Sequence, residues 1–331
     1  MSASITILNF ARQIMRKYGI VVILVLMVII LSILEPVFLT PVNILNILVQ
    51  TSIFGIMALG MTFVIISRGI DLSVGSVLAL SGVVTATLAQ VPDATILFLP
   101  NLPVLPIFVP VLTALLIGGA CGAVNGLLVA KAKIPPFIAT LGMMVAARGF
   151  ALIYTGGRPV FNMVPGITFF GSNLFGVIPV PIIVYFLLIV VSYILLNKTR
   201  FGKNVYAIGG NITAAEVSGV NVPKNQILIF TYCGLLAGIA ALVFLGRVGG
   251  ITPGSAEGFE LTAIAATTIG GTSHAGGVGT IGGAFVGAMV LSVLRNGFTL
   301  LGVSPHWQRV AEGVIIVAAV VVDMRKNTKR E

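Results

Sequence analysis

Ten apolar stretches, most of them long enough to cross a lipid bilayer, follow one another along the chain with short polar breaks between them. A transmembrane helix needs about 20 predominantly apolar residues, because the hydrocarbon core of a bilayer is about 30 Å thick. We therefore expect an all-α polytopic membrane protein with about ten transmembrane helices; eight or nine are the alternatives. The stretches lie near residues 18–34, 43–66, 72–90, 107–130, 136–155, 179–196, 226–246, 260–272, 277–297 and 307–323, of which 260–272 is the least secure.

The composition excludes a soluble globular protein. Only 8% of the 331 residues are charged and 57% are hydrophobic, whereas soluble domains carry about 25% charged residues. So few charges cannot cover a surface that faces water. The 39 glycines suit closely packed membrane helices. We expect residues 1–331 to form a single transmembrane domain, with residues 18–34 as a first spanning helix and not a cleaved leader.

The positive charges predict how the chain is oriented. If the N-terminus is cytoplasmic and the helices alternate in direction, most Lys and Arg residues fall in cytoplasmic segments, as the positive-inside rule requires. The exceptions, outside or in the outer parts of helices, are Arg148, Arg158, Arg247, Arg295 and Arg309. Both termini are then cytoplasmic. The net charge of +10 is explained by attraction to anionic lipid, so nucleic-acid binding is not expected.

The longest cytoplasmic segment on this topology is 197–225, NKTRFGKNVYAIGGNITAAEVSGVNVPKN. Asn211 is a good N-cap, and Ala214, Ala215 and Glu216 favour a helix that Gly219 would end after about two turns. We predict that this short helix docks onto a soluble partner. The alternative is a plain connecting loop.

A polar string, RGIDLSVGS at 68–76, separates the second and third apolar stretches. An oxygen of Asp71 or Ser73 can accept from backbone N–H groups one turn on, which would cap the next helix. Arg68 could pair with Asp71 or simply anchor the chain at the cytoplasmic side. Two interpretations stay open: a capped helix break, and a break in which Asp71 also serves as a gate. The residues concerned are Gly69, Asp71, Ser73, Gly75 and Ser76.

Two apolar stretches carry glycines at every fourth position, which places a smooth stripe on one helix face and lets backbones approach closely. We predict that these helices pack in the core or at a subunit interface. The residues are Gly118, Gly122, Gly126, Gly279, Gly283 and Gly287. A G-x-G-x-x-G match at 277–282 overlaps the second stripe, but it lacks the preceding strand that a dinucleotide site needs.

The chain contains no recognisable catalytic or metal-binding set. Ser273 and His274 are neighbours, but adjacency does not place a hydroxyl on an imidazole, and a loop cap is the simpler interpretation. No G-x-x-x-x-G-K-[ST] loop is present, so ATP, if it is needed, must be bound by another chain. Arg148, Arg295 and Glu312 are candidates for a functional role because ionisable groups are costly in lipid; the two arginines could also snorkel outward.

Several long strings resemble the membrane permeases of monosaccharide ABC importers, most of all the ribose-type permeases. The resemblance covers most of the chain, and GIDLSVGS at 69–76 is its most specific part. Arg68 departs from the pattern, because relatives often have Gly or another small or polar residue there. The other strings are NILNILVQTSIFGIMALGMTFVII at 43–66, PPFIATLGMMVAARGFALIYTGGRPV at 135–160, GKNVYAIGGNITAAEVSGVNVPKNQ at 202–226, ELTAIAATTIGGTSHAGGVGTIGGAFVGA at 260–288 and LLGVSPHWQRVAEGVIIVAAVVVD at 300–323.

The resemblance implies an importer of the type II, vitamin B12-importer-like architecture in a bacterial inner membrane. Two permease subunits, identical or different, would pair above two ATPase subunits that bind ATP and Mg²⁺. A periplasmic sugar-binding protein would deliver a monosaccharide. Glu216 would pair with a basic ATPase surface, and Arg158, Glu257 and Glu260 would lie in outer loops that contact the binding protein. The alternative function is a secondary transporter or channel for a small neutral polar solute; an intramembrane enzyme is disfavoured.

Overall fold

The computed structural model describes residues 19–328, except for the side chains at 322 and 324–328, and is mostly helical. Several of the basic residues used to predict the orientation therefore lie outside the described residues. They are Arg12, Arg16, Lys17, Lys329 and Arg330.

Each of the ten predicted stretches overlaps a helix. Within residues 19–328, six helices are long and apolar enough to cross a membrane, so the protein is an all-α polytopic membrane protein. They are α2 (Pro41–Ile66), α4 (Phe108–Ala130), α5 (Pro136–Thr155), α7 (Val180–Lys198), α10 (Val222–Val248) and α12 (Ile281–Leu300). The other four are the shorter apolar helices Gly19–Leu34, α3 (Val74–Leu88) and α11 (Phe259–Ile269), together with α13 (Pro305–Thr328).

Local sequence sets the ends of the long helices. The side chains of Asn221 and Thr280 accept from backbone N–H groups at the starts of α10 and α12, each at 3.0 Å. Gly156 and Gly249 end α5 and α10 in the left-handed conformation, with φ of 57° and 73°. Glycine adopts this conformation without steric cost.

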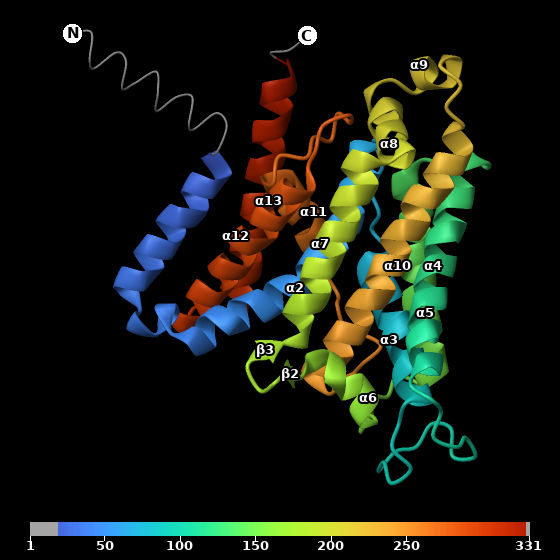
Figure 1. The fold of residues 1–331 in the computed structure, drawn as a ribbon, viewed down its shortest axis with the longest axis vertical. Coiled ribbons are helices and arrows are strands. Elements are labelled where there is room, and N and C mark those ends of the chain that lie inside the picture. The colour runs from blue at the N-terminus through green and yellow to red at the C-terminus, as the bar shows by residue number, and fades with distance from the viewer. Residues whose placement is uncertain (1–18, 329–331) are drawn as a thin grey trace.

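Helix α2 lies at the centre of the molecule. Of its most apolar 18-residue window, 89% is buried inside the protein, against 28% for α4 and 22% for α5. Helices α7, α10, α11 and α12 all pack against α2. Helices α4 and α5 cover α3 on one side, and α13 packs on α11 at the other side (Figure 1). The peripheral helices therefore present apolar faces outward.

The two ends of the helix bundle differ. Helices α8 (Arg200–Gly210) and α9 (Ile212–Val217) lie at one end, at the top of Figure 1, which we call the α9 end. The opposite end, the hairpin end, carries α6 (Pro165–Thr168), η2 (Phe169–Gly171) and the antiparallel pair β2 (Asn173–Leu174) and β3 (Ile178–Pro179). A second antiparallel pair joins β1 (Val160–Phe161) to β4 (Gly250–Ile251). A 3-10 turn, η1 (Pro36–Leu39), precedes α2.

The first glycine stripe faces α10 of the same chain. A Cβ atom added to Gly118 or Gly122 would collide with the α10 backbone at Gly234 or Phe230, and one at Gly126 would collide with Ile227. Helices α4 and α10 therefore touch through their backbones, and this stripe is not free to form a subunit interface.

The second stripe makes a similar contact with α11. Gly283 and Gly287 lie against the backbone at Gly270 and Ala266. Gly279, which we placed in the same helix, precedes the first residue of α12, so the predicted helix start at 277 is wrong. Thr280 caps α12 instead, so the helix begins at Ile281, four residues later than predicted.

The segment 197–225, predicted as a cytoplasmic loop with one short helix, is more helical than expected. It contains the end of α7, all of α8 and α9, and the start of α10. Thr199 Oγ1 accepts from Gly202 N at 3.3 Å at the start of α8. Gly209 and Gly210 form the last turn of α8.

Candidate functional site

The break between α2 and α3 covers residues 67–73. The chain leaves α2 through a turn in which Gly69 N donates to Val64 O at 2.8 Å and Arg68 has a φ of 64°. Gly75 and Ser76, which we assigned to the break, lie in the first turn of α3. Gly69 and Ser76 are buried. The break is therefore a tight, enclosed turn inside the bundle.

Asp71 organises this turn. Its Oδ1 accepts from Ser73 N at 2.8 Å and from Ser73 Oγ at 2.6 Å, and both residues are 1% exposed. The predicted capping geometry is wrong in detail, because neither side chain accepts from an N–H one turn into α3. Asp71 instead forms a turn with the residue immediately before the helix, a common use of a short carboxylate.

Side chains from three other helices complete a buried polar cluster around the break. Asn125 of α4 donates from Nδ2 to Ser73 Oγ at 3.0 Å. Thr140 of α5 donates to the carbonyl of Ile70 at 3.1 Å, and the Cys233 thiol of α10 faces the Asp71 carboxylate. We call Asp71, Ser73, Asn125, Thr140 and Cys233 the break cluster. It ties α4, α5 and α10 to the turn between α2 and α3.

Gly75 connects the break to α11. A Cβ atom at Gly75 would collide with the Glu260 carboxylate and with the Ala256 carbonyl. Glu260 is 8% exposed and accepts from Gly258 N at 3.2 Å, at the start of α11. Our prediction that Glu260 contacts a binding protein is therefore wrong, because its carboxylate points into the protein. Because Gly75 has no side chain, α3 can approach Glu260 closely.

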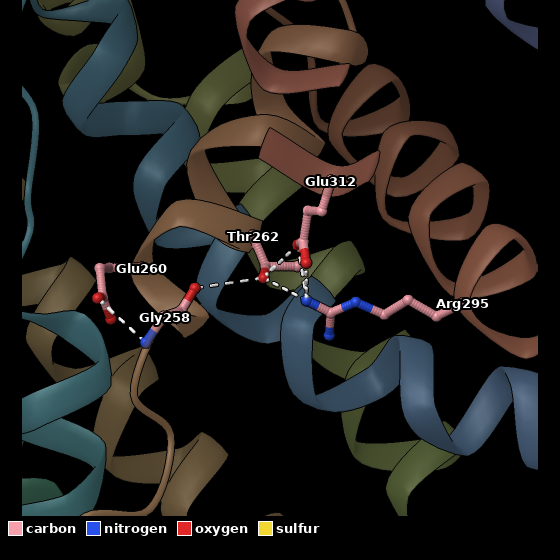
Figure 2. A network of polar contacts seen from close by, with 5 residues as sticks. All are labelled: Gly258, Glu260, Thr262, Arg295 and Glu312. Carbon is pink, nitrogen blue, oxygen red and sulfur yellow. Dashed lines mark hydrogen bonds and ion pairs between the residues drawn. The ribbon is translucent and has the colours of Figure 1, made fainter. Parts of the chain in front are cut away.

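A second polar network includes Thr262, two residues further along α11 than Glu260 (Figure 2). Arg295 of α12 forms an ion pair with Glu312 of α13 at 2.6 Å and donates to Thr262 Oγ1 at 2.7 Å. The hydroxyl of Thr262 donates to Glu312 at 2.7 Å. The Arg295 guanidinium also lies 4.4 Å from the centroid of the Phe54 ring. These contacts join α2, α11, α12 and α13.

This network explains why charged residues occur in apolar helices there. An unpaired charge is costly in a medium of low polarity, and a pair with further hydrogen bonds offsets that cost. Arg295 is thus directed inward, and the interpretation that it snorkels outward is wrong. Arg148 of α5 also has inner partners: it donates to the backbone carbonyls of Pro253 and Ser255, the latter at 2.7 Å. It holds the 252–256 turn against α5.

Helix α9 protrudes from the α9 end (Figure 1). The predicted N-cap is confirmed, because Asn211 Oδ1 accepts from Ala214 N at 3.0 Å. Ala215 is 4% exposed and packs in a small apolar cluster with Ile208 and Val222. Ala214 and Glu216 are exposed, and Val217 is 86% exposed. The helix is short and is held to the protein by Ala215. Its free side exposes the carboxylate of Glu216 beside the apolar side chain of Val217.

The surface beside α9 is hollowed. An open pocket of about 440 Å³ lies between α8, the turn after α9 and the start of α10. Gly219, with a φ of 82°, lies in this turn and lets the chain reverse. The lining includes Asn204, Ser218, Gly219, Asn221 and Lys224. The protruding helix α9 and the pocket beside it form a surface on which a partner protein could dock.

Arg158 and Glu257, the other predicted binding-protein contacts, are both exposed. Arg158 precedes β1 and lies 5.0 Å from the Phe98 ring centroid. Glu257 follows β4, and the pairing of Val160 with Ile251 brings the two segments to the same part of the molecule.

Ser273 and His274 connect the loop after α11 to other helices. His274 Nε2 contacts Thr268 Oγ1 at 2.8 Å, and Ser273 Oγ donates to Asp323 of α13 at 3.2 Å. The backbone N–H of His274 donates to the same Asp323 oxygen at 3.1 Å. Burial lowers the pKa of His274. This agrees with the interpretation of these residues as loop ties.

Sequence reasoning missed several members of these networks. Asn125 lies within the first glycine stripe and Thr140 within an apolar stretch, but neither pattern singles out the polar residue itself, and Thr262 is one of several hydroxyl residues in its helix. A lone amide inside a span, as at Asn125, was the one available signal, since polar side chains in membrane helices usually find partners on another helix.

Comparison with known proteins identifies the family. The model of the permease component of branched-chain amino acid transport systems matches residues 43–320. The chain belongs to this family. It is 41% identical over 319 residues to the ribose import permease of Escherichia coli K12, with 95% of both chains covered. It is 43% identical over 320 residues to the ribose import permease of Bacillus subtilis 168, covering 95% of this chain and 94% of the relative.

A third relative broadens the range of sugars named. The galactose/methyl galactoside import permease of Escherichia coli K12 is 37% identical over 324 residues, with 96% of both chains covered. No solved structure matches the chain. The resemblance to ribose-type sugar permeases that the quoted strings predict is confirmed.

The break cluster generates a testable prediction. Asp71→Asn should leave the folded protein intact, because an amide oxygen can accept the same two hydrogen bonds from Ser73. Asp71→Leu removes the acceptor and leaves buried donors unsatisfied, which costs about 1–3 kcal/mol. Thermal unfolding in detergent measures both. Equal stability of the two variants would contradict the role of Asp71 as the acceptor. Loss of transport by a stable Asp71→Asn protein would assign the carboxylate a gating role as well.

Proposed function

We propose that the chain is the transmembrane permease subunit of an ATP-driven importer, and that it translocates a monosaccharide, a ribose-like pentose or a related sugar. The observation that carries the proposal is the similarity, over nearly the whole chain, to proteins named as ribose import permeases. The galactose-type relative supports a sugar as the class of substrate.

The architecture we propose is the type II permease with about ten membrane-crossing segments. The helix Gly19–Leu34, α3, α11 and α13 would complete the set begun by the six long helices. The α9 end would face the cytoplasm, with both termini on that side of a bacterial inner membrane. Two such permeases, identical or different, would enclose the sugar path.

The ATPase partner would dock on α9. The sequence has no phosphate-binding loop, so ATP and Mg²⁺ would be bound by that partner. Glu216 and Val217 are exposed side by side, and a carboxylate next to an apolar tip suits a basic surface with an apolar recess. A periplasmic sugar-binding protein would deliver the sugar at the hairpin end, where Arg158 and Glu257 are exposed contacts.

The proposed path should be neutral and tolerate hydroxyl groups, because a sugar is a neutral polyol. Only 8% of the residues are charged, and the Arg295–Glu312 pair is neutral as a unit. This scarcity of charge supports a neutral solute rather than an ion.

Uptake by purified components tests the function. Liposomes that hold the permease and its ATPase should accumulate radiolabelled ribose only when ATP is inside and the binding protein is outside. Omission of the ATPase should abolish uptake, because this chain has no means of hydrolysing ATP. Uptake by the permease alone would contradict the proposal and favour a secondary transporter or channel.

A charge reversal tests the docking helix. Glu216→Lys should lower co-purification of the ATPase at least fivefold, because a lysine repels the basic surface that we propose. Glu257→Lys is the matched control: it reverses an exposed carboxylate away from α9 and should leave ATPase binding unchanged. Wild-type ATPase recovery with Glu216→Lys, measured at equal membrane levels of permease, would refute the assigned contact.

A further inference from the structure

Arg68 makes a contact that the sequence did not suggest. Its Nε donates to Gly209 O and its Nη2 donates to Gly210 O, both at 2.7 Å. These carbonyls belong to the last two residues of α8. The last carbonyls of a helix have no hydrogen-bond donor within the helix, and they carry its partial negative charge. A guanidinium supplies both the missing donors and a compensating positive charge. Arg68 therefore binds the end of α8 and does not act as a mere surface anchor.

The end of α8 is also the start of α9. Asn211 is at once the C-cap of α8 and the N-cap of α9. No flexible linker separates the two helices, so a displacement of α9 must move the carbonyls that Arg68 holds.

The backbone segments around Arg68 are in close contact with one another. Gly277 N, in the loop between α11 and α12, donates to Ile66 O at 2.8 Å. A Cβ atom at Gly209 would collide with both of these groups, and one at Gly276 would collide with the Arg68 side chain. Three segments therefore meet in direct contact: the end of α2, the end of α8 and the loop before α12.

The backbone conformation of Arg68 points to a role for its side chain. Its φ of 64° lies in the left-handed region, which glycine adopts freely and which is unfavourable for a residue with a Cβ atom. The next two residues lead directly to Asp71 and the break cluster. The long side chain of Arg68 makes two hydrogen bonds to the end of α8. It therefore links α8 to the turn that Asp71 organises.

We propose that Arg68 is a positioning residue that transmits displacement of α9 to the α2–α3 break. Movement of α9 by a docked partner pulls on the Gly209 and Gly210 carbonyls, and the guanidinium passes this movement to residues 69–73. The proposal rests on the proposed function, because it assumes that α9 is the element on which the ATPase acts.

The test compares Arg68→Gly with the wild type in liposomes that contain the ATPase and the binding protein. Glycine relieves the left-handed strain while it removes both hydrogen bonds, so backbone strain cannot explain a loss. We expect ATP hydrolysis within twofold of the wild type and ribose uptake per ATP at least tenfold lower. Arg200→Ala, which truncates an exposed arginine in the first turn of α8, should keep the wild-type ratio.

Hydrogen exchange provides a readout that a purely structural role would not change. In the wild-type complex, a non-hydrolysable ATP analogue should alter amide exchange in residues 69–76; in Arg68→Gly this response should be lost. If the Arg68→Gly permease does not assemble with the ATPase, Arg68→Lys is tested instead. A lysine ammonium lacks the planar pair of donors with which the guanidinium binds both carbonyls. Arg68→Lys should show a reduced uptake per ATP.

The outcomes separate the two proposals. If Arg68→Gly, or Arg68→Lys where it is used instead, shows wild-type uptake per ATP, the proposed role of Arg68 is wrong. The proposed importer function is unaffected by that result. A parallel loss of uptake and hydrolysis also overturns it, because Arg68 then supports assembly only. Failure of the wild-type permease itself to transport ribose with its ATPase overturns the proposed function instead.

Discussion

Buried polar groups in this protein must find partners within the chain, because the hydrocarbon core of a membrane offers none. The polar networks described here follow from that constraint. Asp71 accepts from Ser73 in its own turn, and Asn125 of α4 donates to the same serine. Arg295 of α12 pairs with Glu312 of α13 and donates to Thr262 of α11. These contacts to other helices join segments that are separate in sequence. The groups that interrupt the apolar helices are therefore also the groups that fix how the helices are arranged.

Close backbone packing makes these networks possible. The glycines of α4 bring its backbone against α10, and this contact brings Asn125 of α4 and Cys233 of α10 together in the break cluster. Gly75 allows α3 to meet the start of α11 beside Glu260. Small residues thus determine where the polar side chains can meet. The same close contacts give α8, α2 and the loop before α12 the direct connection through which movement of α9 would reach the break.

The sequence predicted the helices well and their partners poorly. Apolar length and capping residues are local properties, so each predicted stretch overlaps a helix, and the Asn211 cap is confirmed. Side-chain partners are not local. A pair with Asp71, three residues away, was one of two interpretations of Arg68, but its partners lie 141 and 142 residues away. Glu260 was taken for a loop residue because the helix start and the neighbouring glycine that bury it belong to the tertiary fold.

The central claim is that the two ends of the molecule meet two different partners. Site-specific photo-crosslinking in the assembled importer tests this most directly. Val217 on α9 and Val177 between β2 and β3 are 86% and 68% exposed, so a photoreactive residue fits at either position. A probe at 217 should crosslink to the ATPase alone, and a probe at 177 to the sugar-binding protein alone. An ATPase adduct at 177, or a binding-protein adduct at 217, would contradict the proposed orientation and the docking role of α9.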